Sequence, residues 1–153
     1  MPKALFLDRD GTINVDYGYV FQPEKFEFIP GIFDLCRTAQ QKGYLIIVIT
    51  NQSGIARGYF SDDDFHKINA HMLKAFADRG IKITDVFYCP ELDSENRKPG
   101  CGMFVEAQRK YGIDMAASVS AGDKPRDVEA AVKAGVGKNF LVNGNFDEVM
   151  EAL

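Results

Sequence analysis

Apolar and polar positions form two alternating patterns along this chain. Short runs rich in apolar residues predict strands, and longer stretches with apolar residues on one helical face predict helices that cover them. The expected strands are 3–7, 44–49, 85–89, 118–121 and 139–142. The expected helices are 31–42, 61–80, 102–111, 125–135 and 146–153.

Helix-end signals support these assignments. Ser61 is a good N-cap, and the acidic run 62–64 after it suits the positive end of a helix dipole. Pro125 fits the first turn of a helix, and Gly43 and Gly112 fit helix ends. The boundaries between the alternating elements are therefore marked by local chemistry as well as by periodicity.

Strands that alternate with helices predict a mainly parallel sheet with helices on both faces. The fold class expected is therefore α/β, a Rossmann-like three-layer sandwich with a five-stranded, mainly parallel sheet and no large cap domain. A chain of 153 residues has the usual size of one domain, so residues 1–153 are expected to form a single unit.

Composition narrows the range of partners. The net charge of −4 counts against a nucleic-acid backbone as the main partner. We see no secretory signal, and the apolar run 44–49 is too short to span a bilayer. Three cysteines without a CxxC pair fit a reducing compartment. We expect a cytoplasmic monomer that binds neither membrane nor nucleic acid.

Three polar segments directly follow expected strands, and a fourth lies in the loop after the third strand. These segments are 8–12, 50–54, 97–100 and 122–127. In open parallel sheets, ligands bind beyond the carboxyl ends of the strands, where the strand order reverses. We therefore expect the four segments to meet in one crevice. Several carboxylates and cations there would be costly to bury without a metal ion and an anionic ligand.

The residue types indicate phosphoryl transfer. Asp8 and Asp10 lie two positions apart in extended chain and so face the same side. With Asp123 they offer the hard oxygen ligands that suit Mg²⁺. A carboxylate can also act as a nucleophile and form an aspartyl-phosphate. Thr50 and Lys98 could neutralise and orient the phosphate oxygens.

These segments carry a family resemblance. Residues 8–12 (DRDGT), 50–53 (TNQS), 98–99 (KP) and 122–124 (GDK) resemble, in order, the four motifs of the haloacid dehalogenase superfamily of phosphatases. The chain is most similar to the cap-less branch that holds the D,D-heptose 1,7-bisphosphate phosphatases and the histidinol phosphatases. Residues 6–19, 50–58 and 114–118 carry this closer resemblance, and they look especially like the heptose enzymes.

The resemblance implies a role for each motif residue. Asp8 would be the nucleophile, and Asp10 would be the general acid and then the general base. Thr50 and Lys98 would hold the transferring phosphoryl group. Mg²⁺ would be bound by Asp8, by Asp10 through its backbone carbonyl, and by Asp123. The substrate would be bound by Asp16, Tyr17, Gly18, Tyr19, Asn51, Gln52, Ser53, Arg97 and Lys124.

Two loops set expectations about the shape of the site. The gap between the first strand and the first helix is too short for a large cap. An open site is therefore expected, closed either by a small flap at 16–28 or by the substrate itself. Relatives usually carry a zinc loop after the third strand. Only Cys89 of that ligand set is present in 89–97, so no structural Zn²⁺ is expected.

The best interpretation is hydrolysis of the 7-phosphate of a heptose 1,7-bisphosphate, for lipopolysaccharide or other glycan precursors. Histidinol phosphate, another small phosphomonoester and a nucleic-acid 3′-phosphate are the enzyme alternatives. A receiver-like signalling domain would need a phosphate-accepting Asp on the third strand, where this chain has Phe87 to Cys89. A degenerate binding module is disfavoured because all the expected chemical groups are present.

A few residues are left open by the sequence. Asp127 could be a surface acid or an indirect partner of the metal. Arg57 could contact the far end of the substrate or lie in a solvated loop. Arg126 is expected on the surface, whereas Lys124 is expected in the site. Cys36 is expected in the core, and His66 and His71 are expected to be ordinary surface or packing residues.

Overall fold

The computed structural model describes all residues from 1 to 153 and contains one five-stranded sheet. Its strands are β1 (Ala4–Leu7), β2 (Leu45–Asn51), β3 (Asp85–Cys89), β4 (Val119–Gly122) and β5 (Lys138–Leu141). Its helices are α1 (Ile32–Gln41), α2 (Asp62–Ala77), α3 (Gly102–Tyr111), α4 (Pro125–Lys133) and α5 (Asp147–Ala152). A short 3₁₀ turn, η1 (Pro23–Lys25), was not expected from the sequence.

The predicted strands and helices are all present in the predicted order, with shifts only at their ends. Ser61 caps α2 as expected, in a capping box with Asp64. The α-helix ends at Ala77, three residues before the predicted end, and a turn continues to Gly80 with φ of +73°. The apolar stripe of α2 therefore predicted the helix correctly but not the residue at which it ends, because local backbone geometry sets that end.

The sheet order is β3-β2-β1-β4-β5, and every neighbouring pair is parallel. The sequence predicted a mainly parallel sheet, and the structure has no antiparallel pair in it. The chain moves outward from β1 to β3, and then returns to the other side of β1 with β4. The strand order therefore reverses between β1 and β4, which is where such sheets bind ligands.

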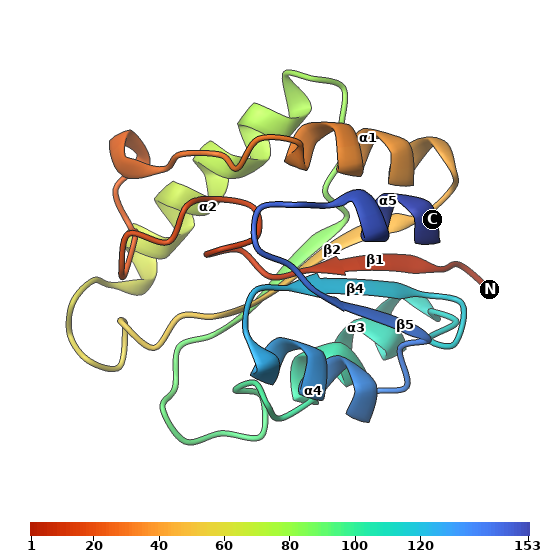
Figure 1. The fold of residues 1–153 in the computed structure, drawn as a ribbon. Helices are drawn as coiled ribbons and strands as arrows, with labels where there is room; N and C mark the ends of the chain where they lie inside the picture. Colours follow the sequence, from red (N-terminus) through yellow and green to blue (C-terminus); the bar gives the residue numbers. More distant parts are fainter.

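The helices lie in two layers on opposite faces of the sheet (Figure 1). Leu5 and Leu7 of β1 belong to the core shared with α1, α2 and α5. Ala4 and Phe6 belong to the core on the other face, which α3 and α4 cover. Alternate residues of one strand thus stabilise both layers, which is why β1 is apolar throughout.

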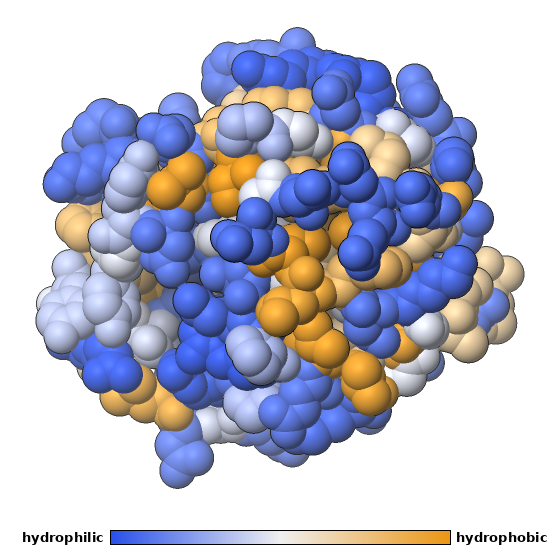
Figure 2. All heavy atoms as spheres, viewed as in Figure 1, coloured by the Kyte–Doolittle hydropathy of each residue, from blue (hydrophilic) through white to orange (hydrophobic).

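Three further features concern membrane spans, the cysteines and the hydropathy of the surface. No helix is both long and apolar enough to cross a bilayer. All three cysteines are free, and Cys36 is buried in the core, where burial raises the pKa of its thiol to about 12. The surface beyond the carboxyl ends of the strands, at the left of Figure 2, is mainly hydrophilic.

Candidate active site

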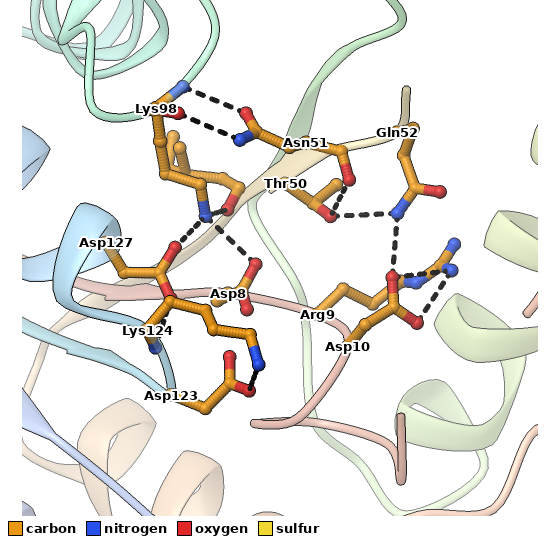
Figure 3. Close-up of polar contacts among 11 residues, drawn as sticks. Asp8, Arg9, Asp10, Thr50, Asn51, Gln52, Lys98, Asp123, Lys124 and Asp127 are labelled. Atoms are coloured by element: carbon orange, nitrogen blue, oxygen red, sulfur yellow. Dashed lines mark hydrogen bonds and ion pairs between the residues drawn. The ribbon is translucent and has the colours of Figure 1, made fainter. Parts of the chain in front are cut away.

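Three carboxylates meet where the strand order reverses. Asp8 follows β1 and Asp123 follows β4, and the Asp8 amide donates to the Ala121 carbonyl at 3.2 Å. Asp127, in the first turn of α4, completes the group (Figure 3). One oxygen from each carboxylate lies within 4.8 Å of the others. The parallel pairing of β1 with β4 is what brings Asp8 and Asp123 together.

Lys98 is the cation of this cluster, and it is 2% exposed. Its Nζ lies 2.9 Å from Asp8 Oδ1 and 2.7 Å from Asp127 Oδ1, and it donates to the Ile49 carbonyl at 2.7 Å. Burial alone would lower the pKa of Lys98, but the two carboxylates outweigh it and raise that pKa. Lys98 is therefore held as an ammonium ion beside Asp8.

Asp8 lies in an environment that disfavours its charge. Burial, and the neighbouring Asp127 and Asp123, raise the pKa of Asp8 well above its usual range despite Lys98. Asp123 Oδ1 is buried and has no hydrogen-bond partner. A divalent cation would satisfy that oxygen and stabilise the ionised form of Asp8. The donor set thus fits Mg²⁺, which prefers carboxylate oxygens.

Gly11 leaves the room that Asp123 occupies. Its φ is +88°, and a β-carbon there would collide with the Asp123 carboxyl group. The glycine of the DRDGT segment is required both for its backbone conformation and for this close approach.

We predict that Gly11→Ala displaces Asp123 and weakens Mg²⁺ binding. The variant should lose about 1–3 kcal/mol of stability, because a non-glycine residue is strained at this φ. It should also lose the rise in melting temperature that Mg²⁺ gives the parent protein. The measurement is thermal unfolding with and without Mg²⁺.

Gly43→Ala is the matched control for Gly11→Ala. Gly43 has a similar φ of +85°, but nothing lies within 4 Å of a β-carbon built there. It should share the backbone strain and keep the Mg²⁺ response. An unchanged Mg²⁺ response in Gly11→Ala would contradict the placement of the metal at Asp123.

Asp10 faces a different part of the crevice and is not in the three-carboxylate group. Its carboxylate accepts from Arg9 Nη2 at 2.9 Å, from Asn14 Nδ2 at 3.0 Å and from Gln52 Nε2 at 3.0 Å. Its side chain is 21% exposed. A carboxyl group held on three sides and open to solvent on the remaining side is suited to exchange protons with a bound ligand.

The β2 end organises the loop that carries Lys98. Asn51 Oδ1 accepts from the Lys98 amide at 2.9 Å, and Asn51 Nδ2 donates to the Lys98 carbonyl at 3.1 Å. Thr50 is 1% exposed, and its hydroxyl accepts from Gln52 Nε2 at 2.9 Å. Asn51 therefore holds the backbone of Lys98, in addition to facing the cavity.

A cavity of about 320 Å³ opens above these groups. Most of the predicted site residues line it, namely Asp8, Asp10, Asp16, Gly18, Tyr19, Asn51, Gln52, Ser53, Arg97, Lys98, Asp123 and Lys124. Thr50 and Tyr17 do not. Thr50 is buried at the end of β2, and the hydroxyl of exposed Tyr17 donates to Glu27 at 2.9 Å.

The cavity also contains residues that the sequence left open or missed. Gly54, Arg57, Arg126 and Asp127 line it as well. Arg57 was left open between a substrate contact and a solvated loop, and Arg126 was expected on the surface. Both are exposed, but at the cavity wall. Arg57 follows the TNQS segment and Arg126 follows the GDK segment, so closeness to a motif was the available signal. Together with Arg97 and Lys124 they line the cavity with positive charge, which suits an anionic ligand.

The segment expected as a flap lies at one side of the cavity. Tyr19, with φ of +50°, contacts Tyr59 edge-on at 4.8 Å between ring centroids. Phe21 stacks on Phe60 at 5.3 Å. These two aromatic pairs join the flap to the loop after β2, and Tyr19 is the one aromatic residue of the four that lines the cavity.

Known proteins resemble this chain over most of its length. The family model described as polynucleotide kinase 3 phosphatase matches residues 3–134. A D-glycero-alpha-D-manno-heptose-1,7-bisphosphate 7-phosphatase of Campylobacter jejuni is 49% identical over 142 residues, covering 92% of this chain and 83% of the relative. The corresponding beta-anomer enzyme of Yersinia pestis is 43% identical over 149 residues, covering 91% and 79%.

A solved structure also resembles the fold of this chain. The D,D-heptose 1,7-bisphosphate phosphatase of B. bronchiseptica, complexed with magnesium and phosphate, superposes with a TM-score of 0.82 and 33% identity. The match covers 89% of this chain and 78% of that one. The fold is therefore shared with a solved phosphatase structure.

Proposed function

The chain belongs to the polynucleotide kinase 3 phosphatase family, within the haloacid dehalogenase phosphatases, and on that premise we propose that it hydrolyses a phosphate monoester through Asp8. The observation that carries the proposal is the position of Asp8. Its carboxylate lies at the floor of the cavity, 2.9 Å from Lys98 Nζ and grouped with Asp123.

The proposed reaction has two displacements at phosphorus. In the first, a carboxylate oxygen of Asp8 bonds to phosphorus while the bond to the leaving oxygen breaks, and Asp10 gives its proton to that oxygen. In the second, Asp10 takes a proton from a water molecule that attacks the aspartyl-phosphate, and the Asp8–phosphate bond breaks. Both carboxyl groups return to their starting states.

The other residues position and neutralise the phosphoryl group. Lys98 offers positive charge beside Asp8, and the Thr50 hydroxyl lies at the end of the neighbouring strand. Asp8, the Asp10 carbonyl and Asp123 would hold Mg²⁺. When bound, that ion supplies charge neutralisation for the phosphate oxygens and for the clustered carboxylates.

The substrate we propose is a heptose 1,7-bisphosphate, which would lose its 7-phosphate. Relatives at 42–49% identity carry that activity in their names, for both anomers. The cavity supports a substrate with a second anionic group, because Arg57, Arg97 and Arg126 line it in addition to Lys98. No bulky cap restricts the size of the sugar.

The test is phosphate release from both heptose anomers, from histidinol phosphate and from a 3′-phosphorylated oligonucleotide, each with Mg²⁺ and with EDTA. We expect Mg²⁺-dependent release from one heptose anomer, with kcat/KM at least about 10-fold above every other substrate. Preference for histidinol phosphate or for the oligonucleotide would keep the mechanism and overturn the substrate. Metal analysis of the purified protein would check the expectation of no structural Zn²⁺.

A further inference from the structure

Arg9 is the largest fully buried side chain of the protein, at 1% exposure. It lies between Asp8 and Asp10 in the sequence, beyond the end of β1, and unlike these two neighbours it does not line the cavity. Burial of a guanidinium ion is costly unless all of its donors are paired. The role of this residue is therefore not explained by packing.

Only one nitrogen of Arg9 is paired. Nη2 lies 2.9 Å from both carboxylate oxygens of Asp10 (Figure 3). It also donates to the Val20 carbonyl at 2.8 Å. Nε and Nη1 are buried without a hydrogen-bond partner. The guanidinium carbon lies 5.9 Å from the ring centroid of Phe26 and 6.0 Å from that of Phe65. The aromatic faces give this cation partial compensation.

An apolar residue of similar volume would be cheaper to bury here, because replacing a buried ion pair by apolar groups is often neutral or stabilising. Arg9 is nevertheless a buried cation, and it contacts Asp10, the carboxyl group that is proposed to transfer protons. The contact made by Nη2 is therefore the feature that needs a functional explanation.

We propose that Arg9 is a positioning residue that fixes the carboxylate of Asp10 towards the leaving oxygen and ties the flap to it through Val20. The inference rests on the proposed phosphatase function. Asn14 and Gln52 also donate to Asp10, one to each oxygen, but both are neutral amides. Arg9 alone contacts both oxygens, and a charge-assisted contact is stronger.

Without the contact from Arg9, the carboxylate of Asp10 is free to rotate away from the leaving oxygen. A displacement of about 1 Å in a reacting group can cost on the order of 100-fold in rate. The loss should be selective, since a general acid matters most when the leaving oxygen is basic and matters little when the leaving group departs readily. Val20 follows Tyr19 at the cavity wall, so a rise in KM that is the same for all small esters is also expected.

The experiment compares kcat/KM for substituted phenyl phosphates of similar size, from 4-nitrophenyl to unsubstituted phenyl, in the native protein and in Arg9→Met. In the native protein, kcat/KM should depend little on the leaving phenol. In Arg9→Met, the least reactive ester should lose at least about 10-fold more than the 4-nitrophenyl ester. Arg9→Lys keeps the cation and should restore part of that difference.

Phe65→Leu is the control for lost packing around the guanidinium. It should lower the melting temperature without changing the dependence on the leaving group. If Arg9→Met does not fold, Arg9→Lys carries the test, with an intermediate selective loss expected. An equal loss for all esters in the Arg9 variants would overturn the positioning role. No hydrolysis by the native protein would instead overturn the proposed function on which the inference rests.

Discussion

Asp8→Asn is expected to reduce phosphate release by at least about 10³-fold, because an amide cannot form the aspartyl-phosphate that the first displacement requires. Asn has almost the same shape as Asp, so Lys98 and Asp127 should keep their positions. The measurement is steady-state phosphate release with Mg²⁺ from the best substrate of the panel.

The same substitution should not destabilise the protein in EDTA. Since the folded-state pKa of Asp8 is raised, its ionisation weakens folding as the pH rises from the unfolded value through the folded one. Asn removes that penalty, so Asp8→Asn should melt at or above the parent temperature at neutral pH. Asp63→Asn, at an exposed position in α2, should leave both activity and melting unchanged. Substantial activity in Asp8→Asn would contradict the assignment of the nucleophile.

Lys98→Met is expected to give the largest combined loss of activity and stability. Removing the ammonium leaves Asp8 and Asp127 facing each other in a buried site, so the free energy of unfolding should fall by about 3 kcal/mol in EDTA. The folded-state pKa of Lys98 is raised, so its contribution is fully present at neutral pH and is lost only under alkaline conditions. Phosphate release should fall at least about 100-fold.

A double-mutant cycle separates the contribution of the ion pair between Lys98 and Asp127 to stability from the other effects of Lys98→Met. Asp127→Asn removes one of the two carboxylates, so Lys98→Met should cost less in that background than in the parent. Lys67→Met, at an exposed position in α2, controls for the loss of one positive charge. Urea unfolding of all four members of the cycle measures the coupling. Additive effects of the two substitutions would contradict the direct contact between Lys98 and Asp127.

Much of this architecture is predictable because its signals are local. Short runs rich in apolar residues, alternating with helical stripes, identified the strands, and the polar segments near their ends identified Asp8, Asp123 and Lys98. The convergence of these residues follows from the single rule that parallel strands present their carboxyl ends at one edge. The sequence could therefore predict which residues meet, although not how each one is paired.

What the sequence missed depends on contacts across the fold. Asp127 was left open between a surface acid and an indirect partner of the metal, because its ion pair with Lys98 requires the placement of α4 against the loop after β3. Arg9 was given no role of its own, because nothing nearby in sequence shows the aromatic pocket formed by Phe26 and Phe65. Tyr17 was expected to bind substrate, yet its hydroxyl pairs with Glu27 across the flap.

The most direct test of the proposed chemistry is to trap the covalent intermediate. The protein would be mixed with a ³²P-labelled substrate and Mg²⁺, quenched in acid during turnover, and digested for mass spectrometry. We predict an acid-stable, hydroxylamine-labile phosphate on the peptide that contains Asp8, and none in Asp8→Asn. Label on another residue, or rapid turnover without any labelled protein, would contradict the assignment of Asp8 as the nucleophile.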